Sequence, residues 1–227
     1  CKNGNIVLKS KSGNQLDITH LIPEDELTHI RRVGRAVAIV KDDMHMYISY
    51  CCNYHVHSKY SILDGMSRLD GIAELSSGVT ALTDHGNMFA FLNWQKAMLH
   101  EGKKAIFGFE AYVEDVVSGE KKGSHLILLA KNEEGLKNIY KLTSMAYNNF
   151  YKKPHVSIDA LKKCHSGVIC TSACVGGELA KASSDPEKAH KIISFYKSVF
   201  GNDYYIEIQR HNFDGESEIN KNLISLA

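Results

Sequence analysis

From residue 51 onward, short apolar runs alternate with segments of helical spacing, and this alternation limits the folds open to the chain. Strands are predicted at 51–57, 79–85, 105–113, 125–130, 167–172 and 204–209. Helices are predicted at 66–77, 88–100, 133–145, 158–164, 187–200 and 216–227, and three of them follow the capping residues Asn132, Ser157 and Asp185. Repeated strand–helix units form parallel strands with right-handed crossovers. The pattern predicts an α/β fold, either a doubly wound sheet or most of a barrel.

Residues 1–50 follow a different pattern. Two strands are predicted at 5–11 and 15–22 around a turn, a helix begins at Pro23, and strands at 35–40 and 44–50 form a hairpin. We therefore expect a small, mainly β N-terminal extension over residues 1–50, followed by a separate domain over residues 51–227.

Two histidines end the first predicted strand of the larger domain. His55 and His57 are two residues apart, so in a strand their side chains point to the same face. Asp64 follows on the next loop. Two imidazoles and a carboxylate at the end of a strand are a nucleus for a metal site with N and O ligands.

Further candidate ligands lie near the ends of later strands, where sites collect in α/β folds. These are His85, Glu110, Cys174 and, at the start of its strand, His125. A lone histidine is more often structural, and a lone cysteine is by default a small buried hydrophobe. The joint occurrence favours a metal centre over separate structural roles.

The donor types suit Zn²⁺, Mn²⁺ or Fe, and the candidates exceed what one tetrahedral ion needs. We therefore expect two or three clustered divalent ions, an arrangement suited to phosphoester cleavage. Asp84, next to His85, is better placed to orient an imidazole than to bind metal directly, and is the candidate for a supporting catalytic role.

Other function classes find little support. There is no phosphate-binding loop, dinucleotide fingerprint or nucleophile elbow. A net charge of +1 disfavours a strongly basic nucleic-acid-binding domain. Apolar runs are too short to span a membrane, and the six cysteines have no disulfide-like spacing, so we expect a cytoplasmic protein without a membrane partner. The run Tyr147–Lys153 mixes aromatics with lysines, and is either a base-stacking surface or a helix end with a surface loop.

The stretch His55-Val56-His57-Ser58-Lys59-Tyr60-Ser61-Ile62-Leu63-Asp64-Gly65 closely resembles the opening of the polymerase-and-histidinol-phosphatase (PHP) domain. More narrowly, it is similar to the version found in bacterial DNA polymerase III alpha subunits. The likeness continues through Thr83-Asp84-His85-Gly86-Asn87-Met88, Gly108-Phe109-Glu110-Ala111-Tyr112-Val113 and Ser172-Ala173-Cys174-Val175-Gly176-Gly177-Glu178, and through 125–132, 150–154 and 207–211. The stand-alone phosphatases share only the scattered ligands, so the polymerase branch is favoured.

The resemblance implies a distorted (β/α)₇ barrel with a trinuclear metal centre at its mouth. Carried over residue by residue, the ligands would be His55, His57, Asp64, His85, Glu110, His125 and Cys174. Family members that keep these ligands are associated with metal-dependent 3′–5′ exonuclease activity, whereas others use the domain as a scaffold. The implied partners are a DNA primer–template, the rest of the polymerase chain and replisome subunits. A stand-alone phosphoesterase and a non-catalytic structural domain are the alternatives.

The chain departs from the family pattern in two places. The family ends its ligand cluster with Asp-x-His on a later strand, whereas this chain stops at Ala227. We therefore expect a domain incomplete at its carboxyl end, with fewer than three ions bound and with weak or no activity of the chain by itself. The chain also begins at Cys1 rather than Met, and the resemblance does not extend to residues 1–50, which fits a fragment of a longer, unusual or phage-encoded polymerase.

Overall fold

The computed structural model describes the strands at 7–9, 15–17, 29–33, 36–41 and 44–48, and residues 53–227 except 63, 77, 122, 151 and 212. The chain divides into two compact units, Cys1–Cys51 and Cys52–Ala227. Within the described residues, no helix combines the length and the apolar composition needed to cross a membrane.

The first unit contains two small antiparallel sheets. One pairs β1 (Val7–Lys9) with β2 (Gln15–Asp17), and the other has the order β3 (His29–Val33), β4 (Ala36–Lys41) and β5 (Met44–Ile48). The hairpin predicted from 35–40 and 44–50 is confirmed as β4–β5. Strand β3 was not predicted, because its two adjacent arginines interrupt the apolar pattern. The helix predicted at Pro23 lies outside the described residues.

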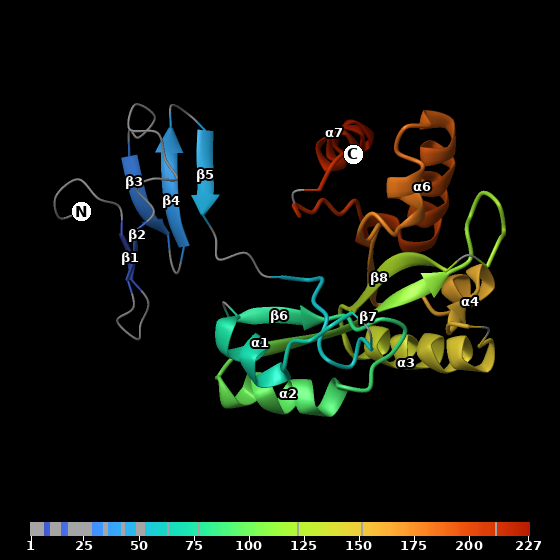
Figure 1. The fold of residues 1–227 in the computed structure, drawn as a ribbon, viewed down its shortest axis with the longest axis horizontal. Coiled ribbons are helices and arrows are strands. Elements are labelled where there is room, and N and C mark those ends of the chain that lie inside the picture. The colour runs from blue at the N-terminus through green and yellow to red at the C-terminus, as the bar shows by residue number, and fades with distance from the viewer. Residues whose placement is uncertain are drawn as a thin grey trace. The chain divides into compact units, whose positions relative to one another are not determined.

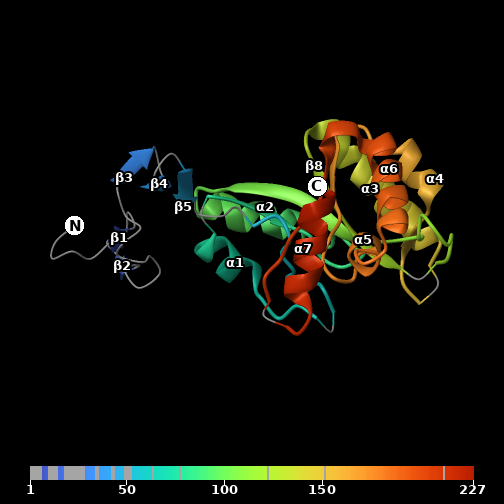
Figure 2. The ribbon, with the colours of Figure 1, turned by 90° about the horizontal axis from the view of Figure 1, so that it is seen from above.

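The second unit is a mixed α/β structure. Its strands are β6 (Val79–Leu82), β7 (Lys104–Val113), β8 (Ser124–Ala130), β9 (His155–Val156), β10 (Val168–Thr171) and β11 (Tyr204–Tyr205). Its helices are α1 (Leu69–Leu75), α2 (Phe91–His100), α3 (Glu133–Asn148), α4 (Ile158–Lys163), α5 (Glu178–Lys181), α6 (Pro186–Phe200) and α7 (Glu216–Leu226), with a 3₁₀ turn at Gly201–Asp203. Helices α1 and α2 lie at the β6 end of the unit, whereas α4 and α6 lie at the other end (Figures 1 and 2).

The six-stranded sheet has the order β11-β10-β8-β7-β6, with β9 paired to β7. The expectation of parallel strands throughout is wrong, because β8 runs antiparallel to both β7 and β10. The connection from β7 to β8 contains no helix, and a direct loop returns the chain in the opposite direction. No ladder among the described residues joins β11 to β6, so the closed barrel stays a prediction.

The predicted strand at 51–57 is also corrected, because residues 53–57 form no regular strand. The segment still runs beside β6: Ala81 N donates to Asn53 O at 2.9 Å, and Thr83 N donates to Val56 O at 2.8 Å. The Val56 N–H is bound by the Thr83 side-chain hydroxyl at 2.9 Å instead of by a backbone carbonyl. This replacement interrupts the ladder while keeping the histidines at the edge of the sheet.

Three helices begin where their capping residues predict, whereas some strand ends and short elements differ from the prediction. Asn132, Ser157 and Asp185 each accept a hydrogen bond from the backbone N–H three residues later, as predicted. Strand β6 ends before the predicted limit at residue 85, and β11 contains only the first residues of the predicted 204–209 strand. Strand β9 and helix α5 were not predicted, since two and four residues carry no periodic signal.

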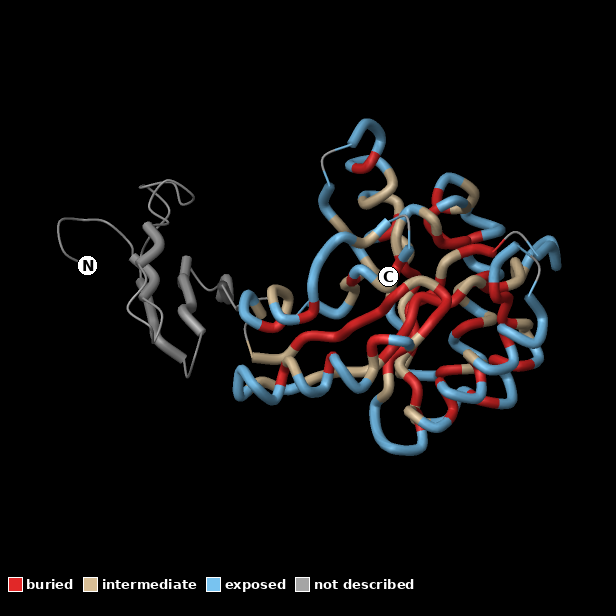
Figure 3. Tube along the Cα trace, turned by 60° about the horizontal axis from the view of Figure 1, so that its bottom comes forward, coloured by how far each residue is buried: buried red, intermediate tan, exposed pale blue. Residues whose placement is uncertain are grey.

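The core lies along the sheet, as the buried central strands in Figure 3 show. Helix α3 buries Ile139, Leu142 and Ala146 in the same apolar cluster as the β8 residues Leu126 and Leu128. A second cluster under α1 and α2 is centred on the fully buried Trp94. Fully burying an apolar side chain stabilises a fold by about 1.5–3 kcal/mol, so the two clusters hold these helices on the sheet.

Candidate metal centre

The ring nitrogens of four histidines converge on the carboxylate of Glu110, which is 0% exposed. Three of them face Oε2 and one faces Oε1. The nitrogen–oxygen distances are 3.3 Å for His55 Nε2, 3.0 Å for His57 Nε2, 3.0 Å for His85 Nδ1 and 2.6 Å for His125 Nδ1. A buried carboxylate is therefore surrounded on both oxygens by imidazoles that come from distant parts of the sequence.

The sheet explains how these side chains meet. Glu110 lies within β7, and His85, just beyond β6, forms an isolated bridge beside it. His125 lies near the start of β8, whereas sites in parallel α/β sheets collect at the carboxyl ends of strands. Because β8 is antiparallel to β7, its start lies at the carboxyl end of β7, with His125 paired to Tyr112. The strand reversal thus brings His125 to the same edge as the other histidines.

The remaining two candidates lie on either side of this cluster. Asp64 Oδ2 is 2.5 Å from His85 Nε2, and its side chain is 61% exposed. Cys174 Sγ lies 3.6 Å from His125 Nδ1 and 3.8 Å from Glu110 Oε1, and accepts the N–H of Gly176 at 3.3 Å. All seven residues suggested by the sequence are thus brought together in space.

Asp84 has a different position. Its buried carboxylate accepts the Ser58 N–H at 2.7 Å and the Ser61 hydroxyl at 2.7 Å. The Ser61 oxygen in turn lies 3.5 Å from His57 Nδ1 and accepts the His85 N–H at 3.1 Å. Asp84 therefore holds the loop after His57 in place, and it is linked to the His57 imidazole through the Ser61 hydroxyl.

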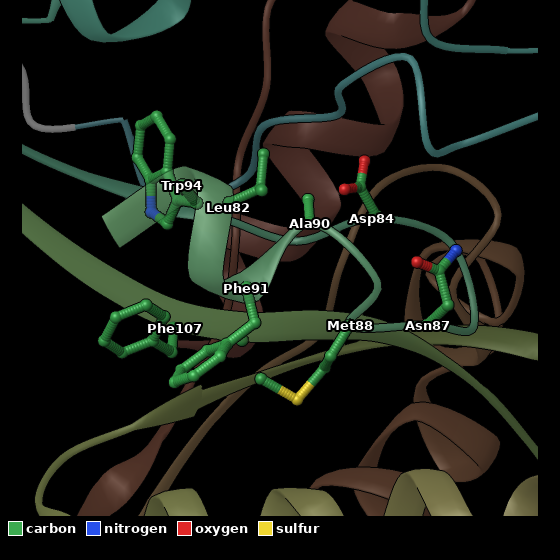
Figure 4. A pocket seen from close by; sticks show the side chains of 9 residues that line it. Leu82, Asp84, Asn87, Met88, Ala90, Phe91, Trp94 and Phe107 are labelled. Atoms are coloured by element: carbon green, nitrogen blue, oxygen red, sulfur yellow. The ribbon is translucent and has the colours of Figure 1, made fainter. Parts of the chain in front are cut away.

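A small pocket lies behind this loop (Figure 4). Asp84 and Asn87 lie at one end of it, and Trp94 and Phe107 lie at the other. The indole N–H of Trp94 donates to the Ile106 carbonyl at 3.2 Å. The Asp84 loop is therefore backed by the apolar cluster under α2, which fixes one wall of the candidate centre.

The charges in the cluster keep Glu110 in its ionised form. Burial opposes the imidazolium form of His55, but hydrogen bonds with Glu110 and Glu207 outweigh it and raise the pKa of His55 to about 10. Burial likewise opposes, and Cys174 and Glu110 favour, a charged His125, whose pKa rises to about 9. Although burial disfavours its ionised form, bonds with His125, His55 and His57 hold the pKa of Glu110 far below its usual range. Glu110 is thus an anion that requires positive charge beside it.

The geometry also fits metal ions. His55 Nε2, His57 Nε2 and Glu110 Oε2 lie 3.0–3.3 Å from one another. Zinc bonds of about 2.0–2.1 Å at tetrahedral angles separate ligand atoms by about 3.4 Å. The buried His85 Nδ1 lies near Glu110 but has no hydrogen-bond partner, as expected for a nitrogen whose lone pair is available to bind a metal.

Among the described residues, three overlapping sets of possible ligand atoms are close enough to share an ion, with the atoms of each set within 4.8 Å of one another. They are His55, His57 and Glu110; His57, Asp64 and His85; and His85, Glu110 and His125. Because neighbouring sets share residues, the donors fit a cluster of ions better than a single ion.

Comparison with known proteins identifies the family. The sequence profile of the PHP domain matches residues 53–211, which span the whole candidate centre. The chain belongs to the PHP domain family. This confirms the resemblance noted in the sequence.

Curated relatives of this PHP domain are DNA polymerase III alpha subunits. The chain is 41% identical over 187 residues to the one from Borreliella burgdorferi, 40% over 188 residues to the one from Treponema pallidum, and 35% over 193 residues to the one from Aquifex aeolicus. Each match covers 76% of this chain and 16% of the relative. The chain thus spans about one sixth of the length of these relatives.

Sequence reasoning missed Glu207 and Gln209 of the PHP domain as site residues. Glu207 Oε1 lies 2.6 Å from His55 Nδ1, its other oxygen accepts the Thr171 hydroxyl, and Gln209 Nε2 lies 2.9 Å from His55 Nδ1. Their position just after a strand is the signal that could have identified them, because both residues follow β11 at the carboxyl edge of the sheet. The predicted strand at 204–209 was too long and placed both residues inside the strand.

Proposed function

We propose that this PHP domain hydrolyses phosphodiester bonds at the 3′ end of DNA, as the 3′–5′ exonuclease part of a DNA-directed DNA polymerase acting in the cytoplasm. The observation that carries the proposal is the convergence of the histidines and outer ligands on one buried carboxylate. The similarity to DNA polymerase III alpha subunits supports DNA as the substrate. The proposed partners are a primer–template, the rest of a polymerase chain and replisome subunits.

The proposed ligands are the seven residues His55, His57, Asp64, His85, Glu110, His125 and Cys174. They would hold clustered divalent ions, Zn²⁺, Mn²⁺ or Fe. Such ions, when bound, activate water and neutralise the charge of the phosphodiester. The protein's own part is to supply opposing charge through Glu110, to keep the imidazoles aligned through Asp84 and Glu207, and to leave Asp64 open to solvent where DNA can approach.

The proposal is tested on 3′-recessed DNA labelled at its 5′ end, with the chain stripped of metal and then supplied with Mn²⁺ or Zn²⁺. We expect slow, stepwise shortening from the 3′ end that stops when EDTA is added. Hydrolysis of small phosphate monoesters but not of DNA would instead indicate a phosphoesterase. If metals raise the melting temperature but no substrate is cleaved with any metal, the centre is structural and the proposal is wrong.

Glu207→Gln should weaken metal binding without unfolding the chain. The Glu207 carboxylate accepts the Nδ1–H of His55 and so directs Nε2 toward Glu110. Loss of such a supporting carboxylate typically costs about 10–100-fold in metal affinity. The measurement is Zn²⁺ titration against a chromogenic chelator, with Glu187→Gln, at an 80% exposed position on α6, as the matched control. Equal affinities for the two variants would show that Glu207 does not support the centre.

A further inference from the structure

Three exposed aromatic side chains lie together on the surface of the second unit. Phe89 precedes α2, Tyr147 lies near the end of α3, and Phe150 follows α3; they are 63%, 38% and 57% exposed. The ring centroids are 5.9 Å apart for Phe89 and Tyr147, and 6.2 Å apart for Tyr147 and Phe150. We call Phe89, Tyr147 and Phe150 the aromatic platform. Its rings pack on one another while keeping large parts of their surfaces in water, and grouped exposed apolar side chains are typical of binding sites.

Tyr112 connects the aromatic platform to the candidate centre. Its ring stacks on that of His85, with centroids 5.9 Å apart and planes within 8° of parallel, and it meets the His125 ring edge-on at 5.3 Å. Tyr112 therefore touches two proposed ligands. The opposite link is made by Lys153, which lies three residues after Phe150 of the aromatic platform and over the Tyr112 ring.

Two lysines lie in the segment that follows Phe150 of the aromatic platform. Lys152 and Lys153 are both exposed, and Lys153 Nζ lies 4.2 Å above the centre of the Tyr112 ring. Lys152 has φ 60°, a left-handed conformation that costs energy in a residue other than glycine. The buried Pro154 follows, close to Gly86 beside His85. The backbone thus turns sharply at this point, and the turn places exposed positive charge between the aromatic platform and the centre.

We propose that the aromatic platform and Lys152–Lys153 bind the unpaired 3′-terminal stretch of a nucleic acid and lead it to the metal centre. Bases would stack on the exposed rings while the lysines meet the phosphates, a combination typical of single-strand binding. This inference rests on the proposed function, because the path ends at the residues proposed to cleave the phosphodiester. A duplex would bind less well, since its bases are already stacked on one another.

Binding is measured by fluorescence anisotropy with a labelled single-stranded oligothymidylate in EDTA, where no metal-dependent cleavage occurs. We expect the chain to bind this probe more tightly than a blunt duplex of equal length. Phe150→Ala should weaken binding by roughly fivefold or more, because each base stacked on an aromatic ring contributes about 1 kcal/mol or more. Leu99→Ala, at a 66% exposed apolar position at the far end of α2, is the matched control.

The lysines are tested by the dependence of binding on salt. Lys153→Gln should reduce the slope of log affinity against log salt by about 0.7, the change expected for one lost phosphate contact on a single strand. Lys197→Gln, exposed on α6, should leave the slope unchanged. These measurements do not depend on cleavage, so tight binding without hydrolysis would leave the path in place and contradict only the proposed activity. No binding, or equal binding by the test and control variants, would overturn the inference.

Discussion

Glu110→Gln should abolish metal-dependent cleavage, lowering the rate by roughly a thousandfold or more, because several kcal/mol of catalysis by the ions depends on their being held. Both oxygens of this carboxylate face histidine nitrogens, and two of the three candidate ligand sets include it. Glutamine has nearly the same shape but carries no charge and presents only one acceptor oxygen. The measurement is the rate of 3′-end shortening together with the metal content of the purified chain.

Removing a buried charge leaves its partners unpaired and can also destabilise a protein by about 3–5 kcal/mol. Glu110→Gln is therefore compared with a second variant. Asp64→Asn changes a proposed ligand that is 61% exposed at the edge of the centre, where stability should not be affected. We expect it to retain the circular dichroism spectrum and melting temperature while cleavage falls by roughly 10–100-fold. Glu133→Gln, at an 81% exposed position on α3, is the control for both variants. Full activity in Glu110→Gln and Asp64→Asn would refute the metal centre.

Gly135→Ala should destabilise the second unit strongly, whereas Gly71→Ala should stabilise it. Both glycines lie in helices, where alanine is ordinarily favoured by about 0.5–1 kcal/mol. A Cβ at Gly71 would meet nothing within 4 Å, but a Cβ at Gly135 would lie 1.7 Å from the backbone oxygen of Gly167. Relieving that overlap requires moving α3 away from the loop before β10.

The expected cost of Gly135→Ala is about 3 kcal/mol or more, at the upper end of overpacking substitutions. Part of it comes from the helix cap, because Gly135 N also donates to Asn132 Oδ1 at 2.9 Å. For a chain of this size the melting temperature should fall by about 6–12 °C, while Gly71→Ala raises it slightly. Thermal unfolding followed by circular dichroism measures both. Similar shifts of the same sign would show that α3 is free to move.

Much of the second unit could be predicted from local signals in the sequence. Helix starts at Asn132, Ser157 and Asp185 were predicted because a cap involves residues only three positions apart. The direction of β8 was not predicted, because strand direction depends on the connection and on partners far away in the chain. The irregular segment at 53–57 was missed for a related reason, since its Val56 N–H is taken by Thr83, 27 residues later.

The candidate site was easier to predict than the sheet that carries it. His55, His57 and Glu110 have side chains whose chemistry is visible in the sequence. Because sites in α/β folds collect at the carboxyl ends of strands, they were also predicted to lie near one another. Glu207 escaped because a carboxylate that supports a ligand looks like any other acidic residue until its partner is known. Its contact with His55 joins residues 152 positions apart, and no local pattern reports such a contact.

That same separation has a consequence for how the domain folds. The candidate centre is complete only when the beginning and the end of the second unit have met, so long loops must close before its last contacts form. An ion that binds there would favour the fully folded chain over every partly folded one. Chelation should therefore speed proteolysis across the entire unit rather than loosen a single loop.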